Sequence, residues 1–538
     1  MSKQLLRPIV VLFILLWVAF AEAGPEKWSL EKAIRIEPGF VSGATAGENK
    51  DVRIFKGIPF AAPPVGELRW KPPQPVKPWE GVRLCADFGP WCPQPKPFIG
   101  HALGKLNEDC LYLNVWTAAK SADEKRPVMV WIHGGGCTTG SGSMAVYDGA
   151  ELARLGVVAV TINYRLGPFG YLAHPLLSKE SPQGVSGNYG HLDQIAALQW
   201  VRKNIAAFGG DPGCVTILGE SAGALSVCRL MISPQSKGLF HRAIAQSGGA
   251  YGRNRRLRER SGLMAPMETE GERIAAALGC DKAEDPLAAL RAKSADELLA
   301  ASDPAQGLYG KGIRFGPVVD GWTIPQDPGR MFEEGKQHDV PLMVGSNADE
   351  GTLFLSQMPV QHVAGYKLMV RSLFRDSAEE LLRLFPCESD DQLKAAFSRL
   401  TTVTAFVAPA RLLAKDMGKK QSPAFLYHFT RVSPALKAVG MGATHSAEIQ
   451  YVFGTLRPPP AHVEKDREIS KAMQACWVRF AKTGNPNGEG LPRWPAYSGA
   501  TDEYMEFGDE ILIGHGLYKE ACDLMEKVLS ESLKRSSD

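Results

Sequence analysis

The sequence predicts an α/β protein whose large, mostly parallel sheet is covered by helices on both faces. Short apolar runs alternate along the chain with segments whose apolar residues recur at helical spacing. Alternation of strand and helix is typical of parallel sheets, because a helix must carry the chain back between two parallel strands. Glycine-rich turns also follow two of the apolar runs. Together these observations favour the α/β class.

The expected elements begin with a strand that ends in three glycines. In chain order they are the strands Val128–His133 and Val157–Tyr164, the helix Leu192–Ala207, the strand Cys214–Leu218, the helix Ala224–Ile232, and the strands Ala243–Gln246 and Pro341–Gly345. Residues 253–302 are charged and rich in Ala and Leu, and residues 360–413 also follow a helical pattern. We interpret both stretches as helical insertions over the edge of the sheet.

Composition limits the class of partner. The chain has 538 residues, of which 44% are hydrophobic and 22% charged, as in a globular protein. This length fits either several domains or one large sheet enlarged by insertions. The formal net charge is only +3, so we do not expect nucleic acid or an anionic membrane as the main partner.

The N-terminus has the pattern of a signal peptide. Lys3 and Arg7 precede an apolar run from Ile9 to Phe20, and the small-x-small sequence Ala21-Glu22-Ala23 follows. We predict a signal peptide over residues 1–23 and an exported protein, secreted or periplasmic, that starts at Gly24. An uncleaved membrane anchor is the alternative, although the run is short for a bilayer. No later segment predicts a membrane span.

Ser221 is the candidate nucleophile. It lies in Gly219-Glu220-Ser221-Ala222-Gly223, between an expected strand and an expected helix. A tight strand-to-helix turn of this kind exposes the serine hydroxyl above the sheet, and the flanking glycines relieve the crowding. The pattern alone is weak, and the strand–turn–helix context makes it specific.

A nucleophilic serine needs a base, and the base needs an orienting acid. Asp349 and Glu350 follow a strand, and the residues alone do not separate them as the acid. Among the histidines after Ser221, His445 lies in a loop of small residues that can bring an imidazole to a serine, whereas His428 fits a strand. The turn His133-Gly134-Gly135-Gly136 predicts backbone amides that converge on an oxyanion.

Cysteines and histidines do not have the spacing of a zinc site, and we expect neither a metal nor a cofactor. Of the ten cysteines, only Cys92 and Cys110 are separated by a short polar, glycine-containing segment able to close as a loop.

At this point the sequence closely resembles the type-B carboxylesterase family, which includes the cholinesterases, over nearly the whole mature chain. The resemblance rests on residues 108–116 (EDCLYLNVW), 187–194 (GNYGHLDQ), 208–212 (FGGDP) with 219–223 (GESAG), and 482–487 (KTGNPN). It implies an α/β-hydrolase fold and one domain over residues 24–538, with helical insertions over the active site.

The resemblance also implies roles for particular residues. It makes Ser221 the nucleophile, Glu350 the acid and His445 the base. It implies Gly135, Gly136 and Ala222 as oxyanion donors, Glu220, Ser247 and Glu448 as residues behind the triad, and a Cys92–Cys110 disulfide bond. Ion pairs Arg69–Glu108 and Arg165–Asp193 are implied by the same matching.

The chain departs from the family at several places. Cys137 stands where an aromatic residue often follows the glycines, and Cys280 and Cys522 lack their partners, with Ala289 and Ala408 at the matching positions. No clear match to the choline-binding aromatic residue is present, so we do not expect cholinesterase activity. The simple cysteine pattern is more typical of a bacterial member.

We therefore predict hydrolysis of a small-molecule carboxylic ester through an acyl-enzyme, without a cofactor. A catalytically silent adhesion-type member of the same fold, and an amidase or acyltransferase with the same triad, are the alternatives. The sequence indicates no oligomeric state.

The substrate prediction rests on five arginines: Arg253, Arg255, Arg256, Arg258 and Arg260. They follow the strand Ala243–Gln246, whose carboxyl end should face the ligand. A solvated surface segment is one interpretation. The other is a rim that attracts esters of polycarboxylic acids, and some bacterial relatives hydrolyse tricarballylate esters of fumonisin toxins.

Overall fold

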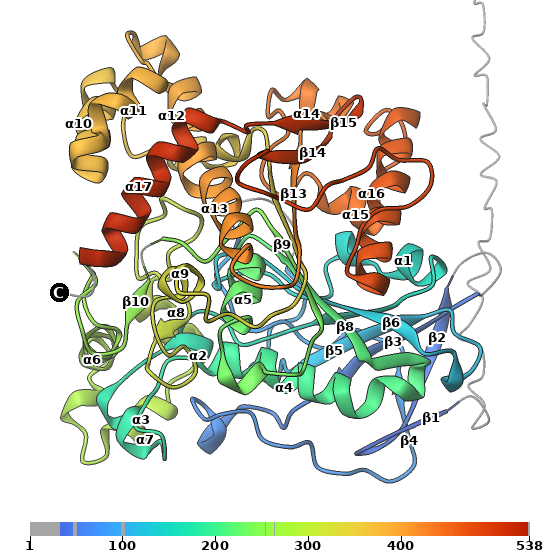
Figure 1. The fold of residues 1–538 in the computed structure, drawn as a ribbon. Helices are drawn as coiled ribbons and strands as arrows, with labels where there is room; N and C mark the ends of the chain where they lie inside the picture. The colour runs from blue at the N-terminus through green and yellow to red at the C-terminus, as the bar shows by residue number, and fades with distance from the viewer. Residues whose placement is uncertain (1–32, 47–50, 98–102, 253, 263, 536–538) are drawn as a thin grey trace, which may run out of the picture.

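The computed structural model describes residues 33–46, 51–97, 103–252, 254–262 and 264–535 (Figure 1). The predicted signal peptide and Arg253 lie outside these residues. A twisted 13-stranded sheet runs through the middle of the molecule, and helices lie on both of its faces. No helix among the described residues combines the length and apolar character that a membrane span requires.

The strands of this sheet are β1 (Ile34–Ile36), β2 (Gly39–Ala46), β3 (Val52–Pro59), β4 (Val82–Cys85), β5 (Tyr112–Thr117), β6 (Arg126–Ile132), β7 (Val158–Ile162), β8 (Gly210–Glu220), β9 (Arg242–Gln246), β12 (Leu342–Asn347), β13 (Ala424–Phe429), β14 (Glu503–Phe507) and β15 (Ile511–His515). Their order is β1-β2-β3-β5-β7-β6-β8-β9-β12-β13-β14-β15, with β4 beside β2. From β7 to β14 all neighbours are parallel. Pairs toward both ends of the sheet are antiparallel, except that β4 pairs with β2 in parallel. The predicted α/β class is confirmed.

The helices are α1 (Ala150–Arg154), α2 (Gly167–Tyr171), α3 (Pro175–Glu180), α4 (Tyr189–Asn204), α5 (Ala222–Leu230), α6 (Met267–Ala277), α7 (Pro286–Arg291), α8 (Ala295–Ser302), α9 (Pro328–Glu333), α10 (Val363–Phe374), α11 (Ala378–Leu384), α12 (Leu393–Thr402), α13 (Ala408–Met417), α14 (Pro434–Ala438), α15 (Ile449–Phe453), α16 (Glu464–Thr483) and α17 (Lys519–Arg535). A 3₁₀ segment, η8 (Glu350–Gln357), follows β12, and a π-helical segment, η11 (Val403–Val407), joins α12 to α13.

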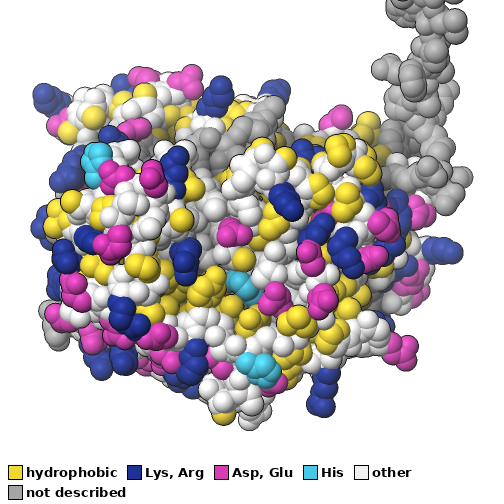
Figure 2. All heavy atoms as spheres, turned by 90° about the horizontal axis from the view of Figure 1, so that it is seen from above, with side chains coloured by type: hydrophobic (Ala, Val, Ile, Leu, Met, Phe, Trp, Pro, Cys, Tyr) yellow, Lys and Arg dark blue, Asp and Glu magenta, His cyan; other side chains and the backbone are white. Residues whose placement is uncertain are grey.

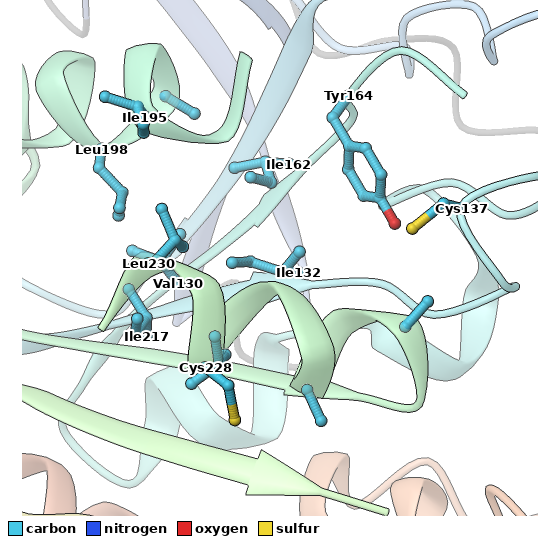
Figure 3. Close-up of a cluster of buried hydrophobic side chains, with 14 of the residues drawn as sticks. Val130, Ile132, Cys137, Ile162, Tyr164, Ile195, Leu198, Ile217, Cys228 and Leu230 are labelled. Atoms are coloured by element: carbon cyan, nitrogen blue, oxygen red, sulfur yellow. The ribbon is translucent and has the colours of Figure 1, made fainter. Parts of the chain in front are cut away.

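Alternate residues of each central strand face opposite helical layers, because side chains alternate along a strand. In β6, Val130 and Ile132 pack with α4 and α5, and Figure 3 shows this cluster between the helices and the sheet. Met129 and Trp131 of the same strand point to the other layer, where Trp131 contacts Phe453 of α15 edge-on at 5.0 Å. The near-continuous apolar runs in the sequence follow from burial on both faces.

The expected strands and helices are present, with ends shifted by a few residues. The largest difference lies in residues 253–302, which we expected to be helical throughout. They begin with a short strand, β10 (Arg255–Arg256), which pairs in parallel with β11 (Val318–Val319) in a second small sheet. The helices α6, α7 and α8 follow it. Local composition does not reveal this pairing, because the partner strand lies some sixty residues further along the chain.

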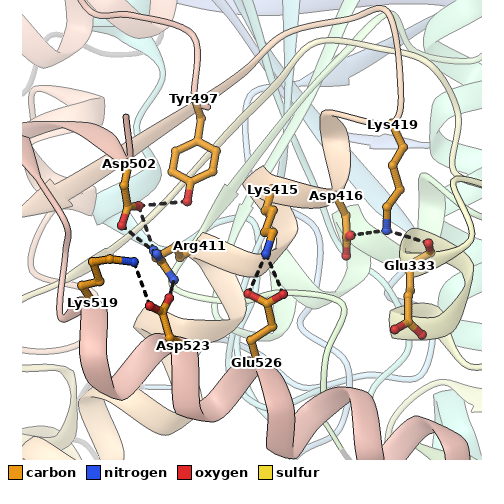
Figure 4. A network of polar contacts seen from close by, with 10 residues as sticks. All are labelled: Glu333, Arg411, Lys415, Asp416, Lys419, Tyr497, Asp502, Lys519, Asp523 and Glu526. Carbon is orange, nitrogen blue, oxygen red and sulfur yellow. Dashed lines mark hydrogen bonds and ion pairs between the residues drawn. The ribbon is translucent and has the colours of Figure 1, made fainter. Parts of the chain in front are cut away.

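The second insertion, residues 360–413, is helical as predicted and forms α10, α11 and α12 over one end of the sheet (Figure 1). The C-terminal helix α17 is tied to α13 by a polar network (Figure 4). Arg411 of α13 donates two hydrogen bonds to Asp502, at 2.8 and 2.6 Å, and one to Asp523 of α17 at 2.9 Å. Lys415 pairs with Glu526 one turn further along both helices.

Both predicted buried ion pairs are present. Arg165 lies in the loop that follows β7 and donates from Nε and Nη2 to the two carboxylate oxygens of Asp193, at 2.8 and 2.7 Å. Both side chains are almost completely buried. Arg69 likewise donates from Nε to Glu108 at 2.7 Å.

The predicted disulfide bond between Cys92 and Cys110 is not formed in the structure. All ten cysteines are free thiols, and nine of them, including these two, are buried. Cys110 is nevertheless in hydrogen-bonding contact with Cys92, and this contact and burial raise the pKa of its thiol. The structure therefore brings the two sulfurs together in their reduced state.

Removal of one partner of the Arg165–Asp193 pair should destabilise the fold strongly. Asp193→Asn leaves a buried guanidinium charge without its counter-ion, and we expect a loss of about 3–5 kcal/mol in the free energy of unfolding. Glu37→Gln is the matched control, because Glu37 pairs with Lys203 at the surface with both side chains more than half exposed. It should cost less than about 1 kcal/mol. Urea unfolding followed by tryptophan fluorescence measures both, and equal losses would contradict the assignment.

Candidate active site

Ser221 occupies the turn between β8 and α5, as predicted. Its backbone angles are φ 56° and ψ −120°, a conformation that residues other than glycine rarely adopt. The turn is held by a hydrogen bond from the Ser221 amide to the carbonyl of Gln246 at the end of β9, at 2.9 Å. The serine therefore stands at the carboxyl end of the parallel sheet in a strained conformation that its neighbours impose.

The two flanking glycines leave no room for a side chain. A Cβ atom on Gly223 would lie 2.0 Å from the carbonyl oxygen of Ile132, and one on Gly219 would lie 2.6 Å from the same oxygen. The turn thus packs directly against the end of β6. This close approach explains in physical terms why the motif requires glycine at both positions.

His445 and Glu350 are brought together from loops 95 residues apart. His445 lies between α14 and α15, and its Nδ1 is 2.5 Å from Oε2 of Glu350 at the start of η8. Asp349, the alternative acid, does not contact the ring. Its carboxylate accepts a hydrogen bond from the amide of Ala443 at 2.8 Å, so it holds the loop that carries His445.

Glu220 faces the other nitrogen of the imidazole. Nε2 of His445 is 3.1 Å from Oε1 of Glu220, and the same oxygen accepts a hydrogen bond from the Ser446 hydroxyl at 2.6 Å. Within the described residues, no hydrogen bond joins the Ser221 hydroxyl to His445. Such bonds often form only when substrate is bound.

The acidic surroundings control the protonation of His445. Burial by itself lowers the pKa of the imidazole, but the carboxylates of Glu220 and Glu350 outweigh it and raise the pKa to about 9. Burial raises the pKa of the Glu220 carboxyl. The Glu220 carboxylate stabilises the imidazolium of His445, and the imidazolium stabilises the carboxylate. The two groups therefore titrate together.

Glu448 joins the site from behind. It is fully buried, and burial raises its pKa. Gln246 and Asn347 donate to its two oxygens at 3.0 and 2.6 Å, and the Asn347 amide donates to Glu350 at 2.8 Å. The ends of β9 and β12 thereby fix both carboxylates. Ser247 lies beside this network with a φ of 53°, and its buried hydroxyl has no hydrogen-bond partner among the described residues.

The glycine turn after β6 lies against Ser221. A Cβ atom on Gly134 would be 3.1 Å from that of Ser221. Gly135 and Gly136 have φ angles of 100° and 65°, and the amide of Ala222 opens α5, where helix amides lack intrahelical acceptors. No backbone acceptor for these three amides occurs in the part of the chain that the structure describes.

These residues open into a cavity of about 420 Å³. His445 is the only histidine among its described lining residues, and Cys137 replaces the expected aromatic side chain in its wall. Two aromatic residues that sequence reasoning missed contact the His445 ring: Phe354 of η8, at 5.3 Å between ring centroids, and Phe406 of η11, at 4.8 Å. The sequence around Phe354 and Phe406 contains no motif that predicts contact with a histidine, since the contact is made by packing between distant segments.

The arginine-rich segment reaches the cavity at one described position. Arg255 lines it, whereas Arg256 pairs with Glu259 and Arg258 with Glu268 outside it. Arg260 is exposed. Two arginines that we did not anticipate, Arg229 and Arg314, also line the cavity. Among the described residues, no group of three or more His, Cys, Asp or Glu side chains is arranged for a metal ion.

A strained serine between strand and helix, an imidazole against a carboxylate, and free turn amides at the carboxyl end of a parallel sheet define the class as a serine hydrolase of the α/β-hydrolase fold. The chain belongs to the carboxylesterase family, whose model matches residues 30–525. It is therefore a carboxylesterase of type B.

Individual relatives of the chain are also esterases. The chain is 40% identical to a fumonisin B1 esterase of Sphingopyxis macrogoltabida over 491 residues, which cover 88% of this chain and 87% of that one. It is 37% identical to the para-nitrobenzyl esterase of Bacillus subtilis, over 88% of this chain and 94% of that one. A solved structure described as PNB esterase superposes with a TM-score of 0.77 at 34% identity, covering 92% of this chain and 99% of that chain.

Proposed function

We propose that the protein hydrolyses carboxylic esters through an acyl-enzyme formed on Ser221, with His445 as base and Glu350 as orienting acid. The contact of 2.5 Å between His445 Nδ1 and Glu350 carries the proposal, because it fixes the ring and leaves Nε2 toward the cavity. Ser221, in the strained turn, lines the same cavity as His445.

In the acylation step, Nε2 of His445 takes the hydroxyl proton while Oγ attacks the ester carbonyl carbon. The imidazolium then gives this proton to the leaving alkoxide, and the alcohol departs. Water, deprotonated by the same nitrogen, attacks the acyl-enzyme, and its proton returns to Ser221 as the acid leaves. Glu350 orients the ring and stabilises the imidazolium at each stage.

The amides of Gly135, Gly136 and Ala222 bind the oxyanion that develops during both steps. Their donors have no other backbone acceptor among the described residues, and they are held by turns rather than by mobile side chains. Preorganised donors of this kind stabilise the transition state without reorganising.

Glu220 has a separate role in the proposal. In the resting enzyme, its proximity to Nε2 favours a proton on the imidazole, and this proton must leave before His445 acts as a base. Glu220 therefore raises the pH at which His445 becomes neutral and able to accept a proton from Ser221.

The proposed substrates are esters of polycarboxylic acids, including tricarballylate esters of the fumonisin type. One support is the 40% identical relative, whose name assigns it fumonisin B1. The other is the arginine content of the cavity wall, since arginine binds carboxylates through two parallel hydrogen bonds.

Substitution of the nucleophile should abolish turnover while leaving the fold intact. Ser221→Ala removes the atom that forms the acyl-enzyme, and kcat should fall by about a millionfold. Turnover of butyl pentanoate and release of acid from fumonisin B1 measure activity, and labelling by a fluorophosphonate measures the nucleophile. An unchanged thermal midpoint is the control for folding. Stoichiometric labelling of Ser221→Ala would refute the assignment.

The acid limb of the pH profile should depend on Glu220. Because the carboxylates hold the pKa of His445 at about 9, kcat/KM should rise with pH as the base loses its proton. Glu220→Gln removes one of these charges, so the limb should move to lower pH by about one unit. Glu67→Gln, an exposed carboxylate outside the cavity, should leave the limb in place. A limb that stays, or moves to higher pH, in Glu220→Gln contradicts the coupling.

We also propose that the protein is exported after cleavage before Gly24, and that Cys92 and Cys110 become joined in the oxidising compartment. Their contact in the folded chain supports this pairing. Mass spectrometry of protein recovered outside the cytoplasm should find an N-terminus at Gly24 and a cross-linked peptide pair, with the buried Cys228 and Cys476 still free. Two free thiols at Cys92 and Cys110 in that protein would overturn the pairing.

A further inference from the structure

Three arginines line one side of the active-site cavity. Arg229 comes from α5, Arg255 from β10, and Arg314 from the segment that precedes β11. The parallel pairing of β10 with β11 places the second and third on one wall. Burial and the charge of Arg255 lower the pKa of Arg314, as expected for two cations that lie close together.

The hydrogen bonds that hold these guanidinium groups go to neutral acceptors. Arg229 donates to the carbonyl of Leu225 at 3.0 Å and to the side chain of Asn254 at 2.7 Å. Arg314 donates to the carbonyls of Gly307 and Leu308 at 2.7 and 3.0 Å. Neither forms an ion pair with any described residue. Arg229 is buried and Arg314 half-buried. Arginines removed from water are normally paired with carboxylates, and these two have no such partner among the described residues.

Two carboxylates offset part of this positive charge, and one of them, Glu270, forms an ion pair with Arg255. Glu270 is 3.9 Å from Arg255, but it lies closer to Arg273, at 3.2 Å. Asp327 reaches Arg229 only through Asn254, from which it accepts a hydrogen bond at 2.9 Å. In addition, the buried Nε of Arg255 has no hydrogen-bond partner within the described residues. The wall therefore holds more positive than negative charge and one unused donor.

Arg229 lies within reach of an ester bound at Ser221, and Arg255 and Arg314 line the same cavity. Ser221, Leu225 and Arg229 are spaced by four residues and share one face of α5. Because Arg229 reaches back to the carbonyl of Leu225, its guanidinium lies about 6 Å along the helix from Ser221. A substituent a few bonds from the scissile carbonyl spans this distance.

We infer that Arg229, Arg255 and Arg314 form a subsite for a free carboxylate that the ester substrate carries in addition to its scissile ester group. The inference rests on the proposed function, because it requires the ester to react at Ser221. The two oxygens of a carboxylate match the fork of an arginine, and low dielectric in the cavity strengthens the contact.

On the face seen from above, Figure 2 shows Lys and Arg side chains interspersed with Asp and Glu, without an extended patch of basic side chains. Arg258, from the same segment as Arg255, supplies a matched control. Its side chain is 56% exposed, pairs with Glu268 and lies outside the cavity.

Three substrates of one shape separate the possible positions of the carboxylate. Butyl pentanoate is the neutral reference. Monobutyl glutarate replaces the terminal methyl group of its acid part with a carboxylate, and the pentanoate ester of 4-hydroxybutanoate does the same in its alcohol part. The quantity measured is the kcat/KM of each anionic ester divided by that of butyl pentanoate, within each variant.

The parent should prefer one of the anionic esters over the neutral reference, and the position of its carboxylate identifies which part of the ester meets the arginines. Arg314→Gln and Arg255→Gln should each lower this ratio by about tenfold, since each removes charged hydrogen bonds to the carboxylate. Arg314→Lys, which keeps the charge without the fork, should lower it less. Arg258→Gln should leave it unchanged, and added salt should reduce it in the parent.

A second probe does not depend on turnover of an anionic ester. Glutarate should inhibit hydrolysis of butyl pentanoate competitively, with an inhibition constant about tenfold weaker in Arg314→Gln than in the parent or in Arg258→Gln. Detectable hydrolysis of butyl pentanoate shows that each variant is folded.

The outcomes distinguish the two proposals. If the parent hydrolyses butyl pentanoate in a Ser221-dependent manner but prefers neither anionic ester, the subsite is refuted and the proposed function stands. The same conclusion follows if Arg258→Gln lowers the ratio as much as Arg314→Gln. If no ester is hydrolysed, the proposed function fails. Calorimetry then tests the anion site by itself: glutarate that binds about tenfold more weakly to Arg314→Gln than to the parent would still support it.

Discussion

The active site depends on the absence of side chains at Gly219 and Gly223, on either side of Ser221. Gly219 and Gly223 lie so close to the carbonyl of Ile132 that a Cβ atom on either would overlap with it. This contact locks the turn onto the end of β6 and holds Ser221 at a positive φ. The strain is compensated by the buried sheet and helices on either side of the turn. Neighbouring strand ends then supply the rest of the site at fixed positions.

Hydrogen bonds explain how three buried carboxylates are tolerated around one imidazole. Glu220 accepts one from the Ser446 hydroxyl in the loop that carries His445. Glu350 and Glu448 accept theirs from groups at the ends of β9 and β12: the Asn347 backbone amide, and the side chains of Gln246 and Asn347. Burial penalises their charges, while the imidazole and these donors stabilise them. The balance makes the protonation of His445 a property of the whole group rather than of one pair.

The cavity is electrostatically divided. Its lining includes Glu220 and His445 of the catalytic group as well as Arg229, Arg255 and Arg314. The two kinds of charge come from different parts of the fold: Glu220 ends β8 of the central sheet, whereas Arg255 lies in β10 of the small sheet and Arg314 in the segment that precedes β11. Changes in the small sheet can therefore alter substrate preference without disturbing the turn around Ser221.

The sequence by itself determined what depends on neighbouring residues: the alternation of strands and helices, the turn chemistry around Ser221, and the glycine turn of Gly135 and Gly136. Together with family resemblance, it also selected Glu350 and His445. Only the tertiary structure decided which arginines face the cavity, which aromatic rings contact His445, and that Cys92 and Cys110 meet as free thiols. Strand and turn patterns repeat over a few residues, so a linear sequence displays them. The pairing of β10 with β11, or of Phe406 with His445, joins distant segments through packing that no local pattern encodes.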